Sequence, residues 1–293
     1  MTPGDVANLI GGEATPARSG RWLEKIRPAD ETVLCRVARS DSDDVDDAVA
    51  VAREAQRAWA ERTAVARGDV LRELALLLRA RREEASAIVV QETGKPEALA
   101  LGETDAAVEM GLFIAGEGRR SYGRTTTASM EHRTVLTMRQ PLGVAALVMS
   151  FNTPLPNVAW KAFPALFCGN AAVVKPSEHT PGSASFFAAL ALEAGVPAGA
   201  LNVVHGFGNE AGCAARRPSG RRPRELHRLC AHRPGDQRGR GEEAGEGLSR
   251  ARGQERARRV RRRGSRQRRA LVDRLGVLER GTTLCVSEQD RCL

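Results

Sequence analysis

Three short polar segments hold the residue types that could perform chemistry: Ser150-Phe-Asn152, Lys175-Pro-Ser-Glu178 and His205-Gly-Phe-Gly208. Lys175 and Glu178 place a cation and a carboxylate in one tight turn, where they could hold the hydroxyl groups of a ribose from two sides. The side-chain amide of Asn152 could donate a hydrogen bond to an oxygen that becomes negative during a reaction, a role worth about 3 to 4 kcal/mol in enzymes. Simpler interpretations are a surface ion pair, a turn at Asn152 and a loop that leads into a helix.

The segments around these residues alternate between strand and helix. The nearly continuous apolar run 142–149 predicts a strand covered on both faces, as in parallel sheets of α/β proteins. A helix, a strand, a helix and a strand are expected next, at 154–167, 171–174, 182–193 and 201–204. This βαβαβ order is the geometry of a dinucleotide-binding half, in which ligands bind beyond the carboxyl ends of the strands. The three polar segments are therefore predicted to meet at one edge of a sheet.

Upstream, residues 1–130 are expected to form hairpin strands and helices that pack on a partial dinucleotide-binding unit at 131–212. Apolar stripes predict helices, and residue alternation predicts strands. The helices are expected at 41–59, 71–82 and 97–118, and the strands at 9–12, within 22–37 and at 132–139. Glu92-Thr-Gly-Lys-Pro is interpreted as a break between helices.

The composition changes abruptly between Gly212 and Cys213. Residues 1–212 contain 22 Lys and Arg against 26 Asp and Glu, whereas residues 213–293 contain 23 Arg against 10 acidic residues. The formal net charge of +9 thus combines −4 in the body with +13 in the tail. The tail has no Phe, Tyr, Trp, Met, Ile, Asn or Lys. Such a composition cannot bury a core, which predicts a largely disordered, Arg-rich tail.

Hydropathy and cysteine usage bear on location and cofactors. No run approaches the roughly 18 apolar residues of a membrane helix, and the N-terminus lacks the pattern of a secretory signal. A cytoplasmic protein with no membrane partner is expected. Cys35 and Cys168 are interpreted as reduced core residues. The four later cysteines lack the spacing of a metal site, so no metal is expected.

Five segments resemble, in order and spacing, the aldehyde dehydrogenase superfamily over residues 8–212. They are Pro141-Leu-Gly-Val, Ser150-Phe-Asn-Thr-Pro, Pro164-Ala-Leu-Phe-Cys-Gly-Asn-Ala, Lys175-Pro-Ser-Glu-His-Thr-Pro and Glu193-Ala-Gly-Val-Pro-Ala-Gly-Ala-Leu-Asn-Val-Val. The resemblance implies an α/β fold with an incomplete Rossmann-type parallel sheet. It also implies an NAD(P)-dependent oxidation of a small-molecule aldehyde to a carboxylate.

The same resemblance implies roles for single residues. Asn152 matches the asparagine that holds the oxyanion, and Lys175 and Glu178 match the pair that binds the adenosine ribose. The residues expected to line the dinucleotide site are Ser150, Phe151, Asn152, Lys175, Ser177, Glu178 and Gly208. In this family a Glu after Lys-Pro-Ser favours NAD, because the carboxylate chelates the free 2′ hydroxyl and repels a phosphate there. NADP stays an alternative.

The family's nucleophilic Cys and water-activating Glu are expected after residue 212, but their motifs are absent from the printed sequence. They are restored in the register one nucleotide later if the segments are encoded by suitable codons. With such codons, that register turns Glu225-Leu-His-Arg-Leu-Cys230 into Ser-Phe-Thr-Gly-Ser, Ser249-Arg-Ala-Arg-Gly-Gln-Glu255 into Leu-Glu-Leu-Gly-Gly-Lys, and Arg280-Gly-Thr-Thr-Leu-Cys-Val286 into Ala-Gly-Gln-Arg-Cys-Ala. The tail is therefore interpreted as an out-of-frame translation, and the chain as written is predicted to be inactive. Cys285 is given no catalytic role, because its neighbours and frame are wrong.

Two alternatives stay open. The tail could be a basic arm that binds RNA, with an affinity that falls as salt rises; the hidden motifs argue against a specific nucleic-acid partner. The chain could also be a folded pseudoenzyme that binds NAD. Against that, the sheet is expected to stop after three parallel strands and leave an unpaired edge. The family's homo-oligomerisation is expected to be lost with its C-terminal strand.

Overall fold

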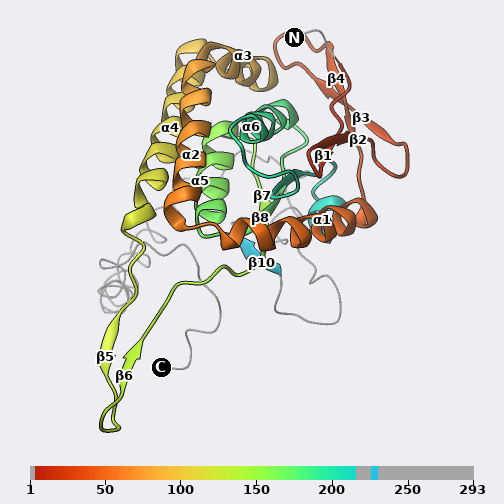
Figure 1. Ribbon diagram of the computed structural model, residues 1–293. Coiled ribbons are helices and arrows are strands. Elements are labelled where there is room, and N and C mark those ends of the chain that lie inside the picture. Colours follow the sequence, from red (N-terminus) through yellow and green to blue (C-terminus); the bar gives the residue numbers. More distant parts are fainter. Residues whose placement is uncertain (1–3, 216–225, 230–293) are drawn as a thin grey trace, which may run out of the picture. The chain divides into compact units, whose positions relative to one another are not determined.

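The computed structural model describes residues 4–215 and 226–229, and at its centre lies a six-stranded sheet (Figure 1). The strand order is β10-β7-β8-β9-β1-β2. Its members are β1 (Asn8–Ile10), β2 (Glu13–Thr15), β7 (Val144–Val148), β8 (Ala171–Lys175), β9 (Leu201–Val203) and β10 (Leu226–Leu229). β10, β7, β8 and β9 run parallel, whereas β1 pairs antiparallel with β9 and with β2. The parallel strands thus follow the order third, second, first, fourth of a Rossmann-type half.

The expectation that the sheet stops after three parallel strands is wrong, because a fourth strand, β10, takes the edge position beside β7. β10 pairs with β7 from Leu226↔Val144 to Leu229↔Leu147, and Leu9 of β1 pairs with Val203 of β9. A ladder needs only backbone N–H and C=O groups, which every residue except proline supplies. The composition of the tail therefore does not prevent a strand from forming at 226–229.

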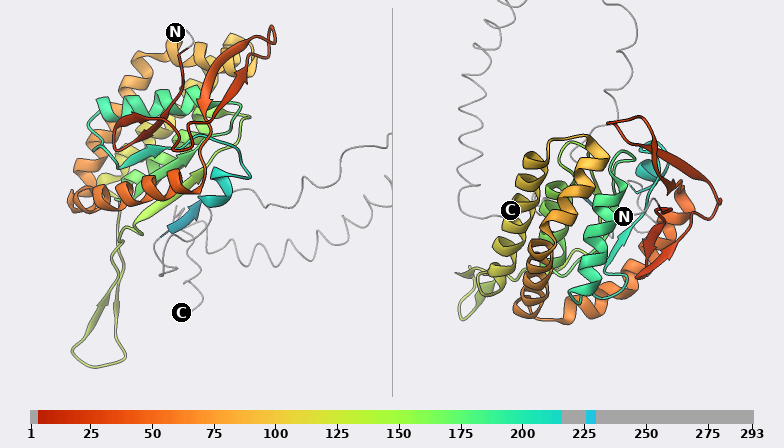
Figure 2. Two further views of the ribbon diagram at one scale, coloured as in Figure 1. Left: turned by 90° about the vertical axis from the view of Figure 1, so that its right-hand side faces the viewer. Right: turned by 90° about the horizontal axis from the view of Figure 1, so that it is seen from above.

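Helices cover both faces of the parallel strands (Figure 2). On one face α1 (Ser42–Glu61) packs Val45 and Val49 in a buried cluster with Val144 and Val173. On the other face, α5 (Pro154–Phe167) and α6 (Pro181–Glu193) pack in a second cluster that includes Leu147. Alternate side chains of β7 and β8 therefore enter opposite clusters, which explains why these strands are apolar throughout.

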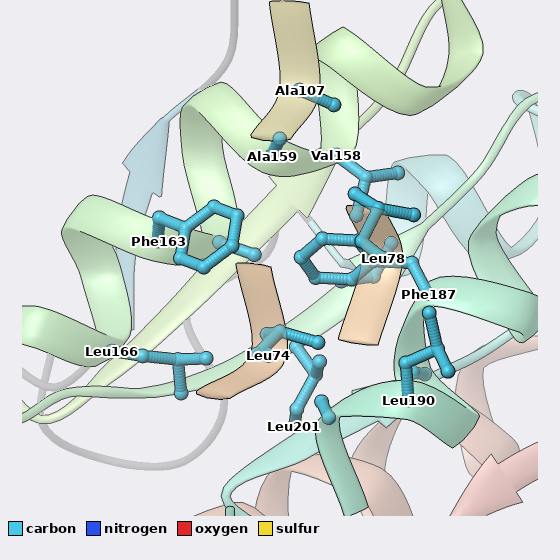
Figure 3. Close-up of a cluster of buried hydrophobic side chains, with 14 of the residues drawn as sticks. Leu74, Leu78, Ala107, Val158, Ala159, Phe163, Leu166, Phe187, Leu190 and Leu201 are labelled. Atoms are coloured by element: carbon cyan, nitrogen blue, oxygen red, sulfur yellow. The ribbon is translucent and has the colours of Figure 1, made fainter. Parts of the chain in front are cut away.

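A helical layer lies outside α5 and α6 and is formed by α2 (Ala64–Ala80), α3 (Arg82–Thr93) and α4 (Glu97–Ala115). Side chains from α2, α4, α5 and α6 converge in one buried cluster (Figure 3). Within it the rings of Phe163 and Phe187 meet edge to face, with centroids 5.5 Å apart. α4 approaches closely at Gly111, where a Cβ atom would lie 2.5 Å from Cζ of Phe163.

Local sequence signals explain where two of these helices begin and end. Asp41 starts α1 with a capping box, in which its side chain accepts from a backbone N–H of the first turn and the Asp44 carboxylate accepts from the Asp41 N–H. α3 ends at Gly94, whose φ of +70° is the left-handed conformation that glycine adopts without strain. The Glu92-Thr-Gly-Lys-Pro segment is therefore a helix break, as predicted.

The remaining strands form two hairpins outside the central sheet: β3 (Trp22–Ile26) with β4 (Val33–Ala38), and β5 (Thr125–Thr127) with β6 (Thr134–Leu136). The β5–β6 hairpin projects away from the helices and exposes Val135 and Leu136 (Figure 1). The chain also forms a short 3₁₀ helix, η1 (Gly116–Arg119), and a short helix, α7 (Ala211–Ala214). Among the described residues, no helix is long and apolar enough to cross a membrane.

The predicted α/β fold is confirmed, with differences in detail. The helix expected at 71–82 is α2, which begins at Ala64 and gives way to α3 at Arg82. The strand expected at 132–139 shrinks to Thr134–Leu136, and its partner Thr125–Thr127 was not predicted. The change of composition after Gly212 falls inside α7. The predictions for the tail beyond residue 215, apart from β10, lie outside the described residues.

Candidate functional site

The first polar segment follows β7, and its side chains hold one another. Ser150 Oγ donates to Asn152 Oδ1, and Asn157 Nδ2 donates to the same Oδ1 at 3.1 Å and to Ser150 Oγ at 3.0 Å. Since the amide oxygen of Asn152 is held on one side, its Nδ2 group faces away as a donor. This is the orientation that an oxyanion-holding amide requires. Asn157, on the first turn of α5, was not predicted from the sequence.

The backbone of Asn152 is held from the helical layer. Lys95, in the break between α3 and α4, donates from Nζ to the Asn152 carbonyl oxygen and pairs with the Glu103 carboxylate of α4. Only about a fifth of the Lys95 side chain is exposed (22%). Sequence reasoning assigned this residue to a helix break and gave it no role at the site. The available signal was a lone lysine in a short break between two helices.

The second polar segment forms the turn between β8 and α6. Lys175 is 2% exposed, and its Nζ lies 3.3 Å from Glu178 Oε2, whose side chain is 30% exposed. Burial lowers the pKa of the Lys175 ammonium, and the Glu178 carboxylate opposes this shift. Ser177 is buried and shapes the turn, because its Oγ accepts from the His179 N–H at 3.2 Å. A buried cation and a half-exposed carboxylate thus project from one rigid turn.

The third polar segment follows β9, and its first two residues, His205 and Gly206, are closely packed. The His205 N–H donates to Asn8 Oδ1 at 2.9 Å, and its ring Nε2 lies 3.0 Å from Ser185 Oγ. Burial, together with the nearby Lys175 charge, lowers the pKa of His205 to about 3, so the ring is neutral at physiological pH. A side chain at Gly206 would meet the Ser40 carbonyl oxygen at 2.9 Å. Gly208 is exposed, and a Cβ there would meet nothing within 4 Å.

The structure brings the loops together at the carboxyl ends of the strands. Phe151, from the first loop, meets the ring of His179, from the second, edge to face with centroids 5.6 Å apart. A Cβ at Gly212 would lie 3.8 Å from Cδ of Lys175, which places the start of α7 over the lysine side chain. The predicted convergence of the polar segments therefore agrees with these contacts. Gly208 is the predicted member that touches the others least.

Two of the three cysteines among the described residues, Cys35 and Cys168, do not supply a nucleophile beside Asn152. Cys168 follows the C-terminal end of α5, whereas Asn152 precedes its N-terminal end, so 14 residues of helix, about 21 Å, separate them. Cys35 lies in the β3–β4 hairpin, where burial raises the pKa of its thiol to about 11. A thiol that stays protonated is a poor nucleophile. Both cysteines fit the predicted structural role.

Parallel strands in the order β9-β8-β7-β10, helices on both faces and polar loops at the carboxyl ends define a Rossmann-type α/β protein. Residues 15–218 match the model of the aldehyde dehydrogenase family. The match therefore ends slightly past Gly212, the point at which the composition changes. The chain belongs to that family.

Solved structures show the same relationship. An NAD-dependent aldehyde dehydrogenase from Sinorhizobium meliloti is 33% identical with a TM-score of 0.71, and the alignment covers 74% of this chain and 44% of that one. For a lactaldehyde dehydrogenase from Escherichia coli the identity is 32%, the TM-score 0.70 and the coverage 72% and 44%. An NADP-dependent enzyme from E. coli is 34% identical with a TM-score of 0.70, and the coverage is 71% and 44%. This chain therefore spans less than half the length of these structures.

Proposed function

We propose that the body of this chain is the cofactor-binding part of an NAD(P)-dependent aldehyde dehydrogenase, which oxidises an aldehyde to a carboxylate. We further propose that the chain as written does not carry out the oxidation. The printed 293 residues contain neither a Gly-Gln-Arg-Cys nor a Leu-Glu-Leu-Gly-Gly-Lys sequence. Suitable codons for residues 249–255 and 280–286 would encode both motifs in the neighbouring register, which supports a shift of frame after residue 212.

The observation that carries the cofactor proposal is the Lys175–Glu178 pair. Its ammonium is almost fully buried, while its carboxylate reaches the surface in the same turn. A ribose offers adjacent hydroxyls that both accept and donate, so a fixed donor and a fixed acceptor suit it. Glu178 further favours NAD, since a second negative charge near the carboxylate would be repelled. The donor set therefore fits a dinucleotide.

The residues of this chain bind the cofactor and stabilise the negative charge that develops on the substrate oxygen. When bound, a nicotinamide ring supplies the acceptor for a hydride from the substrate carbon. Lys175 and Glu178 hold the ribose at the far end of the dinucleotide. The amide of Asn152, which Ser150 and Asn157 orient, donates to the substrate oxygen as negative charge develops there. Lys95 fixes the position of that amide through its hydrogen bond to the Asn152 carbonyl oxygen.

Calorimetric titration with NAD tests the cofactor proposal. Lys175→Met and Glu178→Gln should each weaken NAD at least tenfold, because each removes a charged hydrogen bond worth about 1.5 to 3 kcal/mol. Glu109→Gln, on the exposed side of α4, is the matched control and should leave the affinity unchanged. If wild type binds neither NAD nor NADP, or if all three variants bind NAD equally, the cofactor proposal fails.

The same preparation tests the two finer statements. Glu178→Gln should narrow the preference for NAD over NADP, and a wild-type preference for NADP would contradict the role of the carboxylate. With NAD and short aldehydes, wild type should form no NADH above a blank without protein. Turnover would overturn the proposed inactivity and, with it, the interpretation of the tail.

A further inference from the structure

A buried carboxylate lies where the helical layer meets the start of α6. Glu92, in the last turn of α3, is only 4% exposed. Its Oε1 accepts from the Gly182 N–H at 2.5 Å, and its Oε2 accepts from the Ser183 N–H at 3.1 Å and from Ser183 Oγ at 2.6 Å. Its own carbonyl oxygen accepts from Lys25 Nζ at 2.9 Å. Glu92 thus links the β3–β4 hairpin, α3 and α6.

These bonds replace a cap that α6 does not make for itself. The side chain of Thr180, at the N-cap position, makes no capping hydrogen bond, and Pro181 has no N–H group to donate. The first free N–H groups of this 13-residue helix belong to Gly182 and Ser183, and Glu92 accepts from both. A carboxylate at this end also meets the positive pole of the helix dipole. The start of α6 is therefore fixed by a residue of another helix.

Glycine at position 182 reflects the closeness of this contact. A Cβ there would lie 3.0 Å from Glu92 Oε1 and 3.4 Å from Cγ2 of Ile88. α3 and α6 therefore meet with backbone against side chain, and little room is left for the start of α6 to shift.

The turn that contains Ser177 and Glu178 is held at both ends. Lys175 closes β8, a central strand paired on both sides, and Pro181 opens α6. Only residues 176–180 lie between them. The distance between Lys175 and Glu178 therefore depends on where α6 begins, and Glu92 sets that position.

We propose that Glu92 is a positioning residue for the ribose-binding turn: it caps α6 from outside and so fixes the Lys175–Glu178 pair for the adenosine end of a dinucleotide. This inference rests on the proposed cofactor function. The ligand it concerns is an adenine nucleotide with free ribose hydroxyls, for which AMP is the probe.

The experiment is calorimetric titration of AMP and NAD at pH 8 and low temperature, with folding checked by circular dichroism. Glu92→Gln places an amide N–H group where Oε2 accepts two hydrogen bonds, and AMP should bind about tenfold more weakly. Ser183→Ala removes only the hydroxyl contact and should weaken AMP about threefold. Glu84→Gln, on the exposed side of α3, is the control and should bind as wild type.

A double variant separates positioning from a general loss of structure. In a Glu178→Gln background the turn no longer offers its carboxylate, so adding Glu92→Gln should weaken AMP by less than threefold. An equal tenfold loss in both backgrounds would overturn the inference, and so would wild-type AMP affinity in folded Glu92→Gln and Ser183→Ala. If Glu92→Gln does not fold, Ser183→Ala decides: its threefold loss should nearly vanish in the Glu178→Gln background, and an equal threefold loss in both backgrounds would overturn the inference. If wild type binds neither AMP nor NAD, the proposed function falls first.

Discussion

Glu92→Gln also tests whether a buried carboxyl group makes the stability of this protein depend on pH. Burial raises the pKa of Glu92 from 4.5 to about 7, against the hydrogen bonds from Ser183 and Gly182 and the charge of Lys25. The titratable groups that face it are Lys25 of β3, whose pKa is lowered by burial, and the Cys35 thiol of β4, whose pKa of about 11 keeps it neutral. Glu92 is thus a group in this cluster whose pKa lies near neutral pH.

The sign follows from where the proton is bound. Between pH 4.5 and pH 7 the folded protein holds the Glu92 proton and the unfolded chain has lost it. The free energy of unfolding therefore falls as pH rises through this window. Each tenfold change in the ionisation equilibrium is about 1.4 kcal/mol, so a shift from 4.5 to about 7 corresponds to about 3 kcal/mol. Glutamine has no proton to lose and no such dependence.

Urea unfolding, followed by tryptophan fluorescence from pH 4.5 to 8, measures this effect. All other groups are common to both proteins, so the difference in unfolding free energy, wild type minus Glu92→Gln, isolates the carboxyl group. We expect that difference to fall by about 3 kcal/mol across the window. For Glu84→Gln it should be flat above pH 5, because pairing with Arg81 lowers the pKa of Glu84. A flat or rising difference for Glu92→Gln would refute the reasoning.

Two further predictions concern packing, and urea unfolding measures both. Gly111→Ala should lose about 1 to 3 kcal/mol, because its Cβ would lie 2.5 Å from Phe163. Gly102→Ala, on the same helix with open space around it, should gain about 0.5 to 1 kcal/mol, and equal effects would contradict this account. Trp59→Phe should lose about 1 to 3 kcal/mol with the Nε1 bond to the Leu166 carbonyl. Trp160→Phe is its half-exposed control and should change stability by less than about 0.5 kcal/mol.

The elements that could be predicted are those whose type and bounds depend on residues close together in the sequence. The run 142–149 is apolar on both faces because α1 and α5 cover β7 from opposite sides. The bounds of α5 were predicted to the residue, because Pro154 starts that helix and Gly169, with a φ of +81°, follows its end. Loops after buried parallel strands then share one edge, so their convergence followed from topology alone.

The contacts that hold those loops could not be predicted in this way. Lys95 lies 57 residues before Asn152, and Glu92 lies 90 residues before Gly182. Neither contact can be predicted from the periodic spacing of apolar residues in a helix or a strand. Both residues lie in a segment in which Gly and Pro already explain a break between helices. The local sequence therefore gave no reason to assign Glu92 or Lys95 a contact with a distant loop. A buried charge is recognised only when the partners that satisfy it are known.

Strand β10 shows which property of the tail a change of reading frame would alter and which it would leave unchanged. β10 occupies Leu226–Leu229, which lie within Glu225–Cys230, the segment that suitable codons would turn into Ser-Phe-Thr-Gly-Ser in the neighbouring register. Pairing with β7 uses backbone groups and is indifferent to which side chains the frame delivers. A thiolate and a general base are single side chains, and no backbone substitutes for them. A frame change can therefore leave a strand in place beside the cofactor loops and still remove the chemistry, which is why binding of NAD without turnover is the combination we expect from this chain.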